Sequence, residues 1–285
     1  MRKFGVLSNY KRTDVTIEKE IISWLKAEGA EVIVPEGEYD VVDQSFLHEF
    51  LSEKGFSCDC LIVLGGDGTL LSVARQAANF SVPIFGVNMG HVGFLAEVEP
   101  DDHLYPALRR LLNDDFVLEQ RMMLKIKVFR NGDLFEEFHC LNDCILTKKY
   151  FDGLVHIDAF VDDKPSLSYN GDGLAVATPT GASGYSLSAG GPLVSPEMEA
   201  MILTPVSAHN LYSRTIVIGA NREIMLKASR EEGSCMLYID GKTFTLELTE
   251  DDRIRISKSD LSTRFIRMND KSYFHILNEK LRERS

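Results

Sequence analysis

The sequence predicts two parts with different folds: an α/β N-terminal domain with a doubly wound sheet, and a β-rich C-terminal domain. In the first third of the chain, short apolar runs alternate with segments whose apolar residues recur at helical spacing. This rhythm is typical of a mainly parallel sheet with helices on both faces. After Asp114-Asp115 the sequence changes to alternating apolar and polar residues with short hairpin signals, which favours antiparallel strands.

Strands and helices are expected to follow one another in turn through the first part. Residues 61–64 form a continuous apolar run, as expected for a strand that is covered on both faces. Gly29 lies where the first helix needs a C-terminal cap. We expect strands at 3–8, 31–34, 61–64 and 83–87, a helix marked by Ile17, Ile21 and Trp24, a second marked by Leu70, Leu71, Ala74 and Ala77, and a third over 100–112.

The second part is expected to be built from hairpins. Asn131-Gly132 and Asp240-Gly241 are strong signals for short hairpin turns. Apolar and polar residues alternate from Leu124 to Phe129, and further strands are expected at 141–147, 155–161, 174–177, 215–218, 223–227, 236–239, 243–248 and 253–256, with a final helix over 273–281. We therefore predict domains at 1–115 and 116–262, and a C-terminal segment, 263–285, whose helix packs back on the first domain.

Composition limits the possible partners of the protein. The net charge is −12, so the surface as a whole repels nucleic acid and anionic membranes, and neither is expected as a partner. No apolar stretch approaches the ~20 residues that a membrane span needs. The N-terminus lacks the apolar core of a signal peptide, and five cysteines do not suggest a disulfide framework. We expect a cytoplasmic protein with reduced, buried cysteines.

The run Gly65-Gly66-Asp67-Gly68-Thr69 is the strongest local signal for chemistry. It follows a buried strand and precedes a helix, at the edge of the sheet where open α/β proteins bind ligands. Glycines allow backbone amides to approach phosphate oxygens, and the helix directs its positive end to the same place. Asp67 would repel phosphate, so we assign it another task, such as accepting a proton from an attacking hydroxyl or positioning magnesium.

Three later segments add candidate ligand contacts. The loop from Asn88 to Leu95 is rich in glycine and follows a strand, and its His91 is either a phosphate contact or a solvated loop residue. Asn142-Asp143 interrupts an apolar strand, so it is either a satisfied structural pair or a clamp for a base or ribose. The stretch from Gly171 to Pro192 combines glycines, small hydroxyl residues and Tyr185, which permits close approach of a ligand to the backbone.

In their order and approximate spacing, these segments resemble the NAD kinase family. The resemblance runs from about Leu61 to the C-terminus. The first motif alone is shared with lipid kinases and phosphofructokinases, whereas 178–192 is much more specific. The resemblance implies a phosphofructokinase-like α/β domain that binds the phosphate donor, followed by a β-rich domain that binds the dinucleotide. It also implies transfer of the γ-phosphoryl group of ATP, or in some members of polyphosphate, to the 2′-hydroxyl of the adenosine ribose of NAD.

The same resemblance assigns roles to individual residues. Asp67 would be the base for the 2′-hydroxyl, and the four residues around it, Gly65, Gly66, Gly68 and Thr69, would cradle phosphates, with Gly68 also touching NAD. Asn142 and Asp143 would hold the adenosine part of NAD. The dinucleotide site would be lined by Asp172, Ser183, Gly184, Tyr185, Ser186, Leu187 and Ser188, with Tyr185 against the adenine.

The resemblance further implies Mg²⁺ or another divalent cation bound with ATP, with no metal site of the protein's own, and a homodimer or homotetramer. The sequence departs from the family pattern at several places. The family's common Asn-Glu pair is Asn142-Asp143 here, and its Gly-Ser-Thr-Ala-Tyr run is Gly-Ala-Ser-Gly-Tyr at 181–185. Its frequent Asp-Gly-Gln turn is Asp240-Gly241-Lys242, and Ser72 stands where a basic residue is often found. These departures bear on individual contacts and on the choice of phosphoryl donor.

Two other functions are compatible with the first motif. A lipid kinase of the diacylglycerol or sphingosine type is disfavoured by the acidic composition and by the lack of a basic amphipathic helix. A non-catalytic dinucleotide-binding regulator is disfavoured by Asp67, because a pure binder gains little from a carboxylate beside phosphate.

Overall fold

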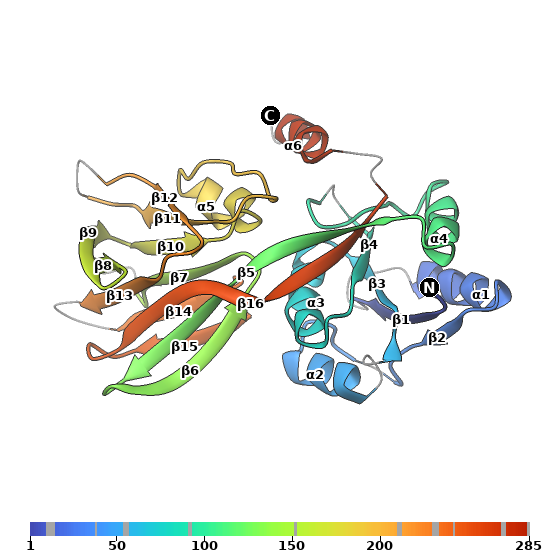
Figure 1. The fold of residues 1–285 in the computed structure, drawn as a ribbon, viewed down its shortest axis with the longest axis horizontal. Coiled ribbons are helices and arrows are strands. Elements are labelled where there is room, and N and C mark those ends of the chain that lie inside the picture. The colour runs from blue at the N-terminus through green and yellow to red at the C-terminus, as the bar shows by residue number, and fades with distance from the viewer. Residues whose placement is uncertain are drawn as a thin grey trace. The chain divides into compact units, whose positions relative to one another are not determined.

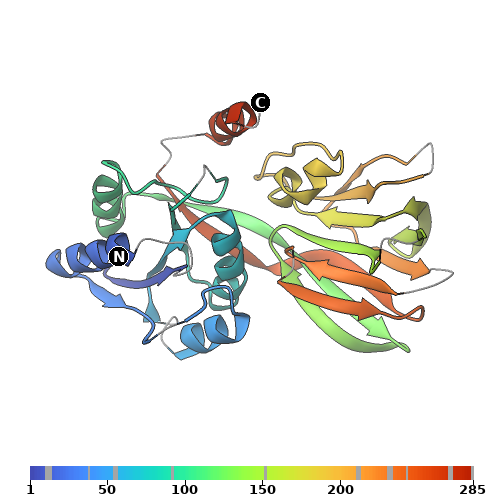
Figure 2. The ribbon, with the colours of Figure 1, turned by 180° about the vertical axis from the view of Figure 1, so that it is seen from behind.

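The computed structural model describes residues 1–9, 15–37, 39–53, 57–90, 93–150, 153–209, 213–229, 234–241, 243–268 and 272–283. His91 and Lys242 of the sequence analysis lie outside these residues. The chain divides into two compact units: unit 1 consists of 1–120 and 263–285, and unit 2 of 121–262. Figures 1 and 2 show the elements of both units from opposite sides.

Unit 1 contains the predicted parallel sheet. Its strands are β1 (Lys3–Ser8), β2 (Glu31–Ile33), β3 (Cys60–Gly65) and β4 (Ile84–Asn88), in the order β2-β1-β3-β4, and all three pairings are parallel. Every residue of β3 and β4 is buried, which confirms the reading of their apolar runs as central strands. Phe265 near the end of β16 (Arg253–Arg267) pairs with Ile84 and so adds a strand beside β4.

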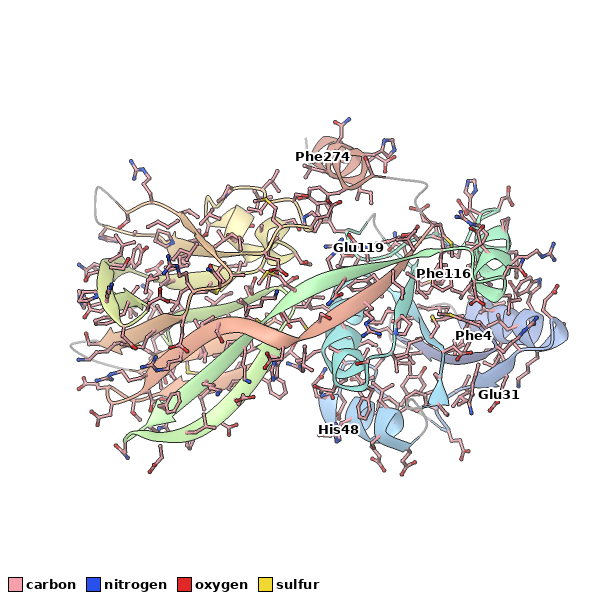
Figure 3. The ribbon with its side chains drawn as sticks, in the orientation of Figure 1. Phe4, Glu31, His48, Phe116, Glu119 and Phe274 are labelled. Atoms are coloured by element: carbon pink, nitrogen blue, oxygen red, sulfur yellow. The ribbon has the colours of Figure 1, made fainter. Side chains whose placement is uncertain are left out.

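Helices cover both faces of this sheet, as expected for a doubly wound fold (Figure 1). On one face, α1 (Val15–Ala27) and α4 (Leu104–Leu112) pack against side chains of β1, β3 and β4 in a core that includes Phe4 (Figure 3). On the other face, α3 (Asp67–Phe80) packs against α2 (Gln44–Glu53). Helix α2 was not predicted from the sequence, and α4 begins four residues later than predicted, at Leu104 instead of residue 100.

The C-terminal segment belongs to unit 1, and its helix α6 spans Tyr273–Glu283. The ring of Tyr273 lies 5.9 Å from the ring of Phe94. Its neighbour Phe274 is 68% exposed (Figure 3). None of the helices that the structure describes is both long enough and apolar enough to span a bilayer.

Unit 2 is a sandwich of two antiparallel sheets around one apolar core, which agrees with the predicted β-rich domain. One sheet has the strand order β12-β11-β10-β7-β14-β15. The other has the strand order β9-β8-β13-β16-β5-β6. The core receives side chains from both sheets, Leu124 and Leu237 among them. The strands are β5 (Val117–Arg130), β6 (Asp133–Cys140), β7 (Asp143–Lys148), β8 (Val155–Val161), β9 (Lys164–Gly171), β10 (Gly173–Ala177), β11 (Ala200–Val206), β12 (Ile216–Gly219), β13 (Ile224–Ser229), β14 (Cys235–Ile239), β15 (Phe244–Leu248) and β16.

Both predicted hairpins are present. Asn131 and Gly132 have φ values of 53° and 91° and join Arg130 of β5 to its partner Asp133 of β6, as a two-residue turn requires. Asp240 and Gly241 lie between the paired strands β14 and β15. Strands β9 and β11 were not predicted, and β16 extends eleven residues beyond the expected end at residue 256, to Arg267.

Candidate functional site

The motif from Gly65 to Thr69 lies where β3 passes into α3 in unit 1: Gly65 ends the strand, Gly66 connects the two elements, and Asp67 to Thr69 form the start of the helix. An added Cβ at Gly65 would stand 2.6 Å from Cβ of Thr69, so the close contact of strand and helix requires glycine here. Gly66 is the N-cap of α3, and within the described residues no side chain caps this helix. The first turn of α3 therefore offers backbone N–H groups and the positive end of the helix dipole to an anion.

Asp67 is held by the second glycine-rich loop. Its Oδ2 accepts a hydrogen bond from the backbone N–H of Phe94 at 2.9 Å, and its Oδ1 accepts one from Leu95 at 3.1 Å. A Cβ added at Gly93 would overlap Oδ1 of Asp67. The loop thus fixes the direction of the carboxylate, and glycine at 93 makes the close approach possible.

Thr69 has a buried side chain, and its Oγ1 accepts a hydrogen bond from Nδ2 of Asn9 at 3.2 Å. Asn9 directly follows β1, which lies beside β3 in the sheet. Two strand ends therefore meet at this loop, as expected for the carboxyl edge of a parallel sheet. Asn9 was not identified from the sequence, because a single asparagine after a strand carries no distinctive pattern.

In unit 2, Asn142 and Asp143 stand at the start of β7 and are organised by Asp240. The carboxylate of Asp240 accepts backbone hydrogen bonds from Leu141 at 3.0 Å, Asn142 at 2.7 Å and Asp143 at 3.3 Å. Oδ1 of Asn142 is buried and has no hydrogen-bond partner among the described residues. A buried amide oxygen without a partner is costly, which favours the ligand-clamp reading over that of a satisfied structural pair.

Asp143 is 4% exposed. Burial raises the pKa of Asp143 to about 7, the nearby carboxylate of Asp240 adds to the rise, and a hydrogen bond from the backbone of Gly241 opposes it. A buried carboxyl group beside a second carboxylate is unfavourable for folding alone. Such placements gather at functional sites.

Replacement of Asp143 by Asn should stabilise the ligand-free protein, increasingly so as the pH rises. The folded protein protonates Asp143 more readily than the unfolded chain, whose carboxyl groups titrate near pH 4. The stability that protonation of Asp143 contributes to the folded protein is therefore fully present below about pH 4 and is lost as the pH rises through about 7. Denaturant unfolding at pH 4 to 8 should show the difference in favour of Asp143→Asn growing by up to about 1.4 kcal/mol per pH unit. A difference that does not change with pH would refute this electrostatic account.

The segment from Thr178 to Ser188 packs its first half against Asn142. Thr178 is fully buried, donates its Oγ1 proton to the carbonyl of Leu141 at 2.6 Å and accepts the N–H of Gly181 at 3.1 Å. Its own N–H donates to the carbonyl of Asn142 at 2.8 Å. A Cβ at Gly181 would overlap that same carbonyl. Glycine at 181 therefore lets the segment lie directly on the Asn142 backbone.

The second half of the segment consists of a 3₁₀ turn (Gly181–Ser183) and the short helix α5 (Tyr185–Ser188). Oγ of Ser183 donates to the carbonyl of Thr180. Ser186 is fully buried and hydrogen-bonded to Oγ1 of Thr204 at 2.8 Å, so only its backbone can contact a ligand. Leu187 is half-buried and Ser188 is exposed.

Tyr185 is 43% exposed, and burial of its remainder raises the pKa of the phenol, with smaller contributions from Asp172 and Asp143. Asp172 forms an ion pair with Lys148 at 2.6 Å, which lowers the pKa of the Asp172 carboxyl. A Cβ at Gly184 would stand 3.7 Å from Nδ2 of Asn142 and 4.0 Å from Oδ2 of Asp143. Unit 2 thus brings together the predicted residues Asn142, Asp143, Asp172, Gly184 and Tyr185.

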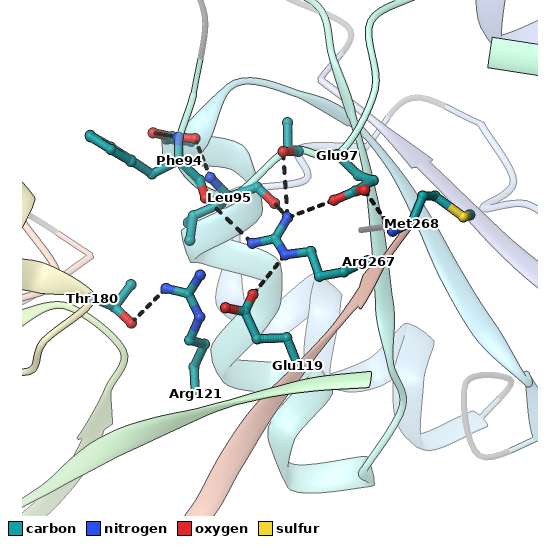
Figure 4. Close-up of polar contacts among 10 residues, drawn as sticks. Phe94, Leu95, Glu97, Glu119, Arg121, Thr180, Arg267 and Met268 are labelled. Carbon is teal, nitrogen blue, oxygen red and sulfur yellow. Dashed lines mark hydrogen bonds and ion pairs between the residues drawn. The ribbon is translucent and has the colours of Figure 1, made fainter. Parts of the chain in front are cut away.

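Two arginines, one in each unit, were not identified from the sequence. Arg121 is 4% exposed and donates from Nη1 to Oγ1 of Thr180 at 3.2 Å in unit 2. Arg267 in unit 1 contacts the loop that holds Asp67 (Figure 4). In the described part of the chain, no three His, Cys, Asp or Glu side chains gather in a way that could hold a metal ion.

Two family models match most of the chain. The model described as the ATP-NAD kinase N-terminal domain matches residues 4–116, and the model described as the ATP-NAD kinase C-terminal domain matches residues 141–268. Similar curated proteins include the NAD kinase of Caldanaerobacter subterraneus subsp. tengcongensis, which is 38% identical over 289 residues with 100% of each chain covered. The NAD kinase of Desulforamulus reducens is 38% identical over 286 residues, covering 99% of this chain and 98% of the relative.

Two solved structures share the fold of the whole chain. Yeast NADH kinase complexed with NADH has a TM-score of 0.81 at 21% identity, covering 99% of this chain and 87% of its own. An NAD kinase from Archaeoglobus fulgidus in complex with ATP has a TM-score of 0.74 at 24% identity, covering 98% of each chain. At these identities the likeness is one of fold.

Proposed function

The chain belongs to the NAD kinase family, and from its geometry we propose how it performs the reaction of that family. It is an enzyme that transfers the γ-phosphoryl group of ATP to the 2′-hydroxyl of the adenosine ribose of NAD, giving NADP and ADP. The observation that carries the proposed mechanism concerns Asp67 at the start of α3: the backbone N–H groups of Phe94 and Leu95 fix its carboxylate.

We propose that Asp67 is the base for the 2′-hydroxyl. A ribose hydroxyl is a poor nucleophile at neutral pH, and a carboxylate within hydrogen-bond reach accepts its proton as the bond to phosphorus forms. The two donors from Phe94 and Leu95 hold the carboxylate in one orientation. The glycines of the loop and Thr69 would contact phosphate oxygens through the free end of α3. Phosphoryl transfer gains mainly from such alignment and charge neutralisation.

We propose that Mg²⁺ enters with ATP and is held largely by the phosphate oxygens. This mode of binding is usual for magnesium in kinases and needs no cage of protein ligands. The described residues fit this mode of binding, because the start of α3 supplies one carboxylate, that of Asp67, together with backbone N–H donors. When bound, the ion would neutralise charge on the transferring phosphoryl group.

We propose that the cluster in unit 2 holds NAD. Asn142 and Asp143 offer amide and carboxylate groups to the adenosine part, and the unpartnered Oδ1 of Asn142 supports this assignment. The half-exposed ring of Tyr185 offers a stacking surface for adenine. Gly184, Asp172 and the 183–188 backbone would line the rest of the site.

Replacement of Gly93 by Ala should reduce kcat by about 10- to 100-fold, because a displacement of about 1 Å at a reacting group has effects of that size. The added Cβ would push Oδ1 of Asp67 from its place while leaving the carboxylate chemically intact. The NAD and ATP dissociation constants should stay within about twofold of the wild-type values. Steady-state kinetics and equilibrium binding on the same samples check this, and an unchanged kcat would show that the direction of Asp67 does not matter.

The activity is tested by incubating the purified protein with ATP, Mg²⁺ and NAD and measuring NADP with an NADP-specific dehydrogenase. We expect NADP formation that EDTA abolishes. Parallel reactions with NADH in place of NAD, and with polyphosphate in place of ATP, would define acceptor and donor preference. Absence of NADP with NAD, and of NADPH with NADH, for all donors tested would refute the proposal.

We further propose that the α/β domain, residues 1–115, is phosphofructokinase-like and binds the phosphate donor, that 116–262 binds the dinucleotide, and that the segment 263–285 completes the first domain. The ring contact between Tyr273 and Phe94 supports the last point. We also propose a cytoplasmic homodimer or homotetramer. Leu134 and Phe135 on β6 are 53% and 44% exposed, which offers apolar surface for a subunit contact.

A further inference from the structure

We propose that Arg267 is a positioning residue for Asp67, acting through the backbone of Phe94 and Leu95. This inference rests on the proposed role of Asp67 as the base. Arg267 is the last residue of β16, two hundred positions after Asp67 in the chain. The side chains of Arg267 and Asp67 bond to the carbonyl and N–H groups, respectively, of the same loop.

Phe94 and Leu95 each bond to both partners. Their N–H groups donate to the carboxylate of Asp67, at 2.9 Å and 3.1 Å. Their carbonyls accept from the guanidinium of Arg267, at 3.4 Å from Nη2 for Phe94 and 2.9 Å from Nη1 for Leu95 (Figure 4). The peptide group that joins Phe94 to Leu95 has its carbonyl bonded to the cation and its N–H bonded to the anion. The two charges polarise this peptide group in the same direction, so its two hydrogen bonds reinforce one another.

The guanidinium is itself held firmly. Nε donates to Glu119 at 2.6 Å and Nη1 to Glu97 at 3.2 Å. The side chains of Arg267 and Glu97 are only 13% and 12% exposed, so these charge-assisted bonds are partly shielded from water. The guanidinium carbon also lies 5.3 Å from the ring centre of the buried Phe265. Its donors are directed at two carboxylates and at three carbonyls, those of Phe94, Leu95 and Ala96. Arg267 therefore serves as a fixed anchor for the loop.

Two features separate this arrangement from ordinary packing. Gly93 removes the side chain that would separate the loop from Asp67. Glu97 accepts a hydrogen bond from the N–H of Met268 at 2.6 Å as well as the bond from Arg267. Two consecutive residues at the end of β16 therefore bond to the carboxylate of Glu97. Loss of Arg267 would leave Phe94 and Leu95 free to shift, and the carboxylate of Asp67 would shift with them.

The test is a double-mutant cycle on kcat, measured as transfer of radiolabel from γ-labelled ATP to NAD. Arg267→Met should lower kcat by about 10- to 100-fold, the effect of a small misplacement of a reacting group, with the KM values for NAD and ATP within about twofold. In the Asp67→Asn background, Arg267→Met should lower kcat by less than about twofold, because residues that act as one unit are not additive. Arg267→Lys should recover part of the loss.

Controls separate positioning from stability. Arg110→Gln removes another arginine that bonds to this stretch, through the carbonyl of Met268 at 2.8 Å, and kcat should be unchanged. In Arg267→Met, the carboxylates of Glu119 and Glu97 lose the guanidinium to which they bond. The double variant Arg267→Met/Glu119→Gln removes one of these charges, so it should recover thermal stability and keep the low kcat. If Arg267→Met alone fails to fold, the double variant takes its place in the test.

The possible outcomes are distinguishable. If Asp67→Asn lowers kcat but Arg267→Met has no effect, or has the same fold effect in both backgrounds, the positioning role is wrong and the base role stands. If Asp67→Asn leaves kcat unchanged, the base role is wrong and the inference about Arg267 falls with it.

Discussion

Replacement of Asp67 by Asn is expected to lower kcat by about 10²- to 10⁴-fold, the range that a positioned general base contributes. Asn has the same shape but cannot take the proton of the 2′-hydroxyl. One cost comes from geometry: both carboxylate oxygens accept a backbone N–H, and the amide nitrogen of Asn would face one of these donors. We therefore expect an additional loss of about 1 kcal/mol in the free energy of unfolding.

Steady-state kinetics of NADP formation, with equilibrium binding of NAD and ATP, would check this prediction. Both affinities should stay within a few-fold of wild type, because Asp67 is assigned to the chemical step. Asp101→Asn is a matched control: this carboxylate also accepts a backbone N–H near a helix start in unit 1, from His103 at 2.8 Å, and its loss should leave kcat unchanged. Equal kcat values for wild type and Asp67→Asn would remove Asp67 from the mechanism.

Replacement of Gly181 by Ala is expected to have the second largest effect, on NAD binding. The added Cβ would overlap the backbone carbonyl of Asn142, and neither backbone segment can move away without breaking the bonds of Thr178 to Leu141 and Asn142. We expect the dissociation constant of NAD to rise at least tenfold and the free energy of unfolding to fall by about 1–3 kcal/mol, as for other overpacked sites.

Calorimetric titration with NAD and denaturant unfolding would measure the two effects of Gly181→Ala. Gly219→Ala in the same unit is the control, since its Cβ would meet only Oδ1 of Asn221, the end of a side chain that can swing away. Normal NAD affinity in Gly181→Ala would show that the contact with Asn142 does not shape the dinucleotide site.

Local patterns allowed much of the fold to be predicted. The apolar run of β3, the glycine loop and α3 are adjacent in sequence, and each follows from its neighbours. Helix α2 was missed although its signals are present: Leu47, Phe50 and Leu51 are buried at helical spacing, and Asp43 caps the helix through Ser45 N–H at 2.8 Å. That helix was predictable in principle.

Other elements lacked a clear signal. Asp162 and Asp163 form the turn between β8 and β9 with φ values of 50° and 60°, a conformation for which glycine and asparagine are the usual indicators. Strand β11 contains Pro205, which argues against a strand in a sequence reading. The later part of β16 contains the run 257–263, rich in Ser, Thr and Asp, without the alternation that marks a half-buried strand.

The same distinction holds for the site. Asp67, Asn142, Asp143 and the 178–188 segment could be proposed from the sequence because each belongs to a compact motif. The groups that orient them come from far along the chain: 27 residues separate Asp67 from Phe94, 98 separate Asn142 from Asp240, and 172 separate Leu95 from Arg267. No sequence pattern links residues at such separations, because only the tertiary fold brings them together.

The most direct test of the central claim is to follow the labelled phosphoryl group in a single turnover. Enzyme in excess would be mixed with γ-labelled ATP, Mg²⁺ and NAD, and the product analysed by chromatography and by phosphorus NMR. The account predicts that the label appears at the 2′-position of the adenosine ribose, one per NAD converted, in wild type and far more slowly in Asp67→Asn. Label in inorganic phosphate alone, on another hydroxyl, or on the 2′-position at equal rates in both proteins would contradict it.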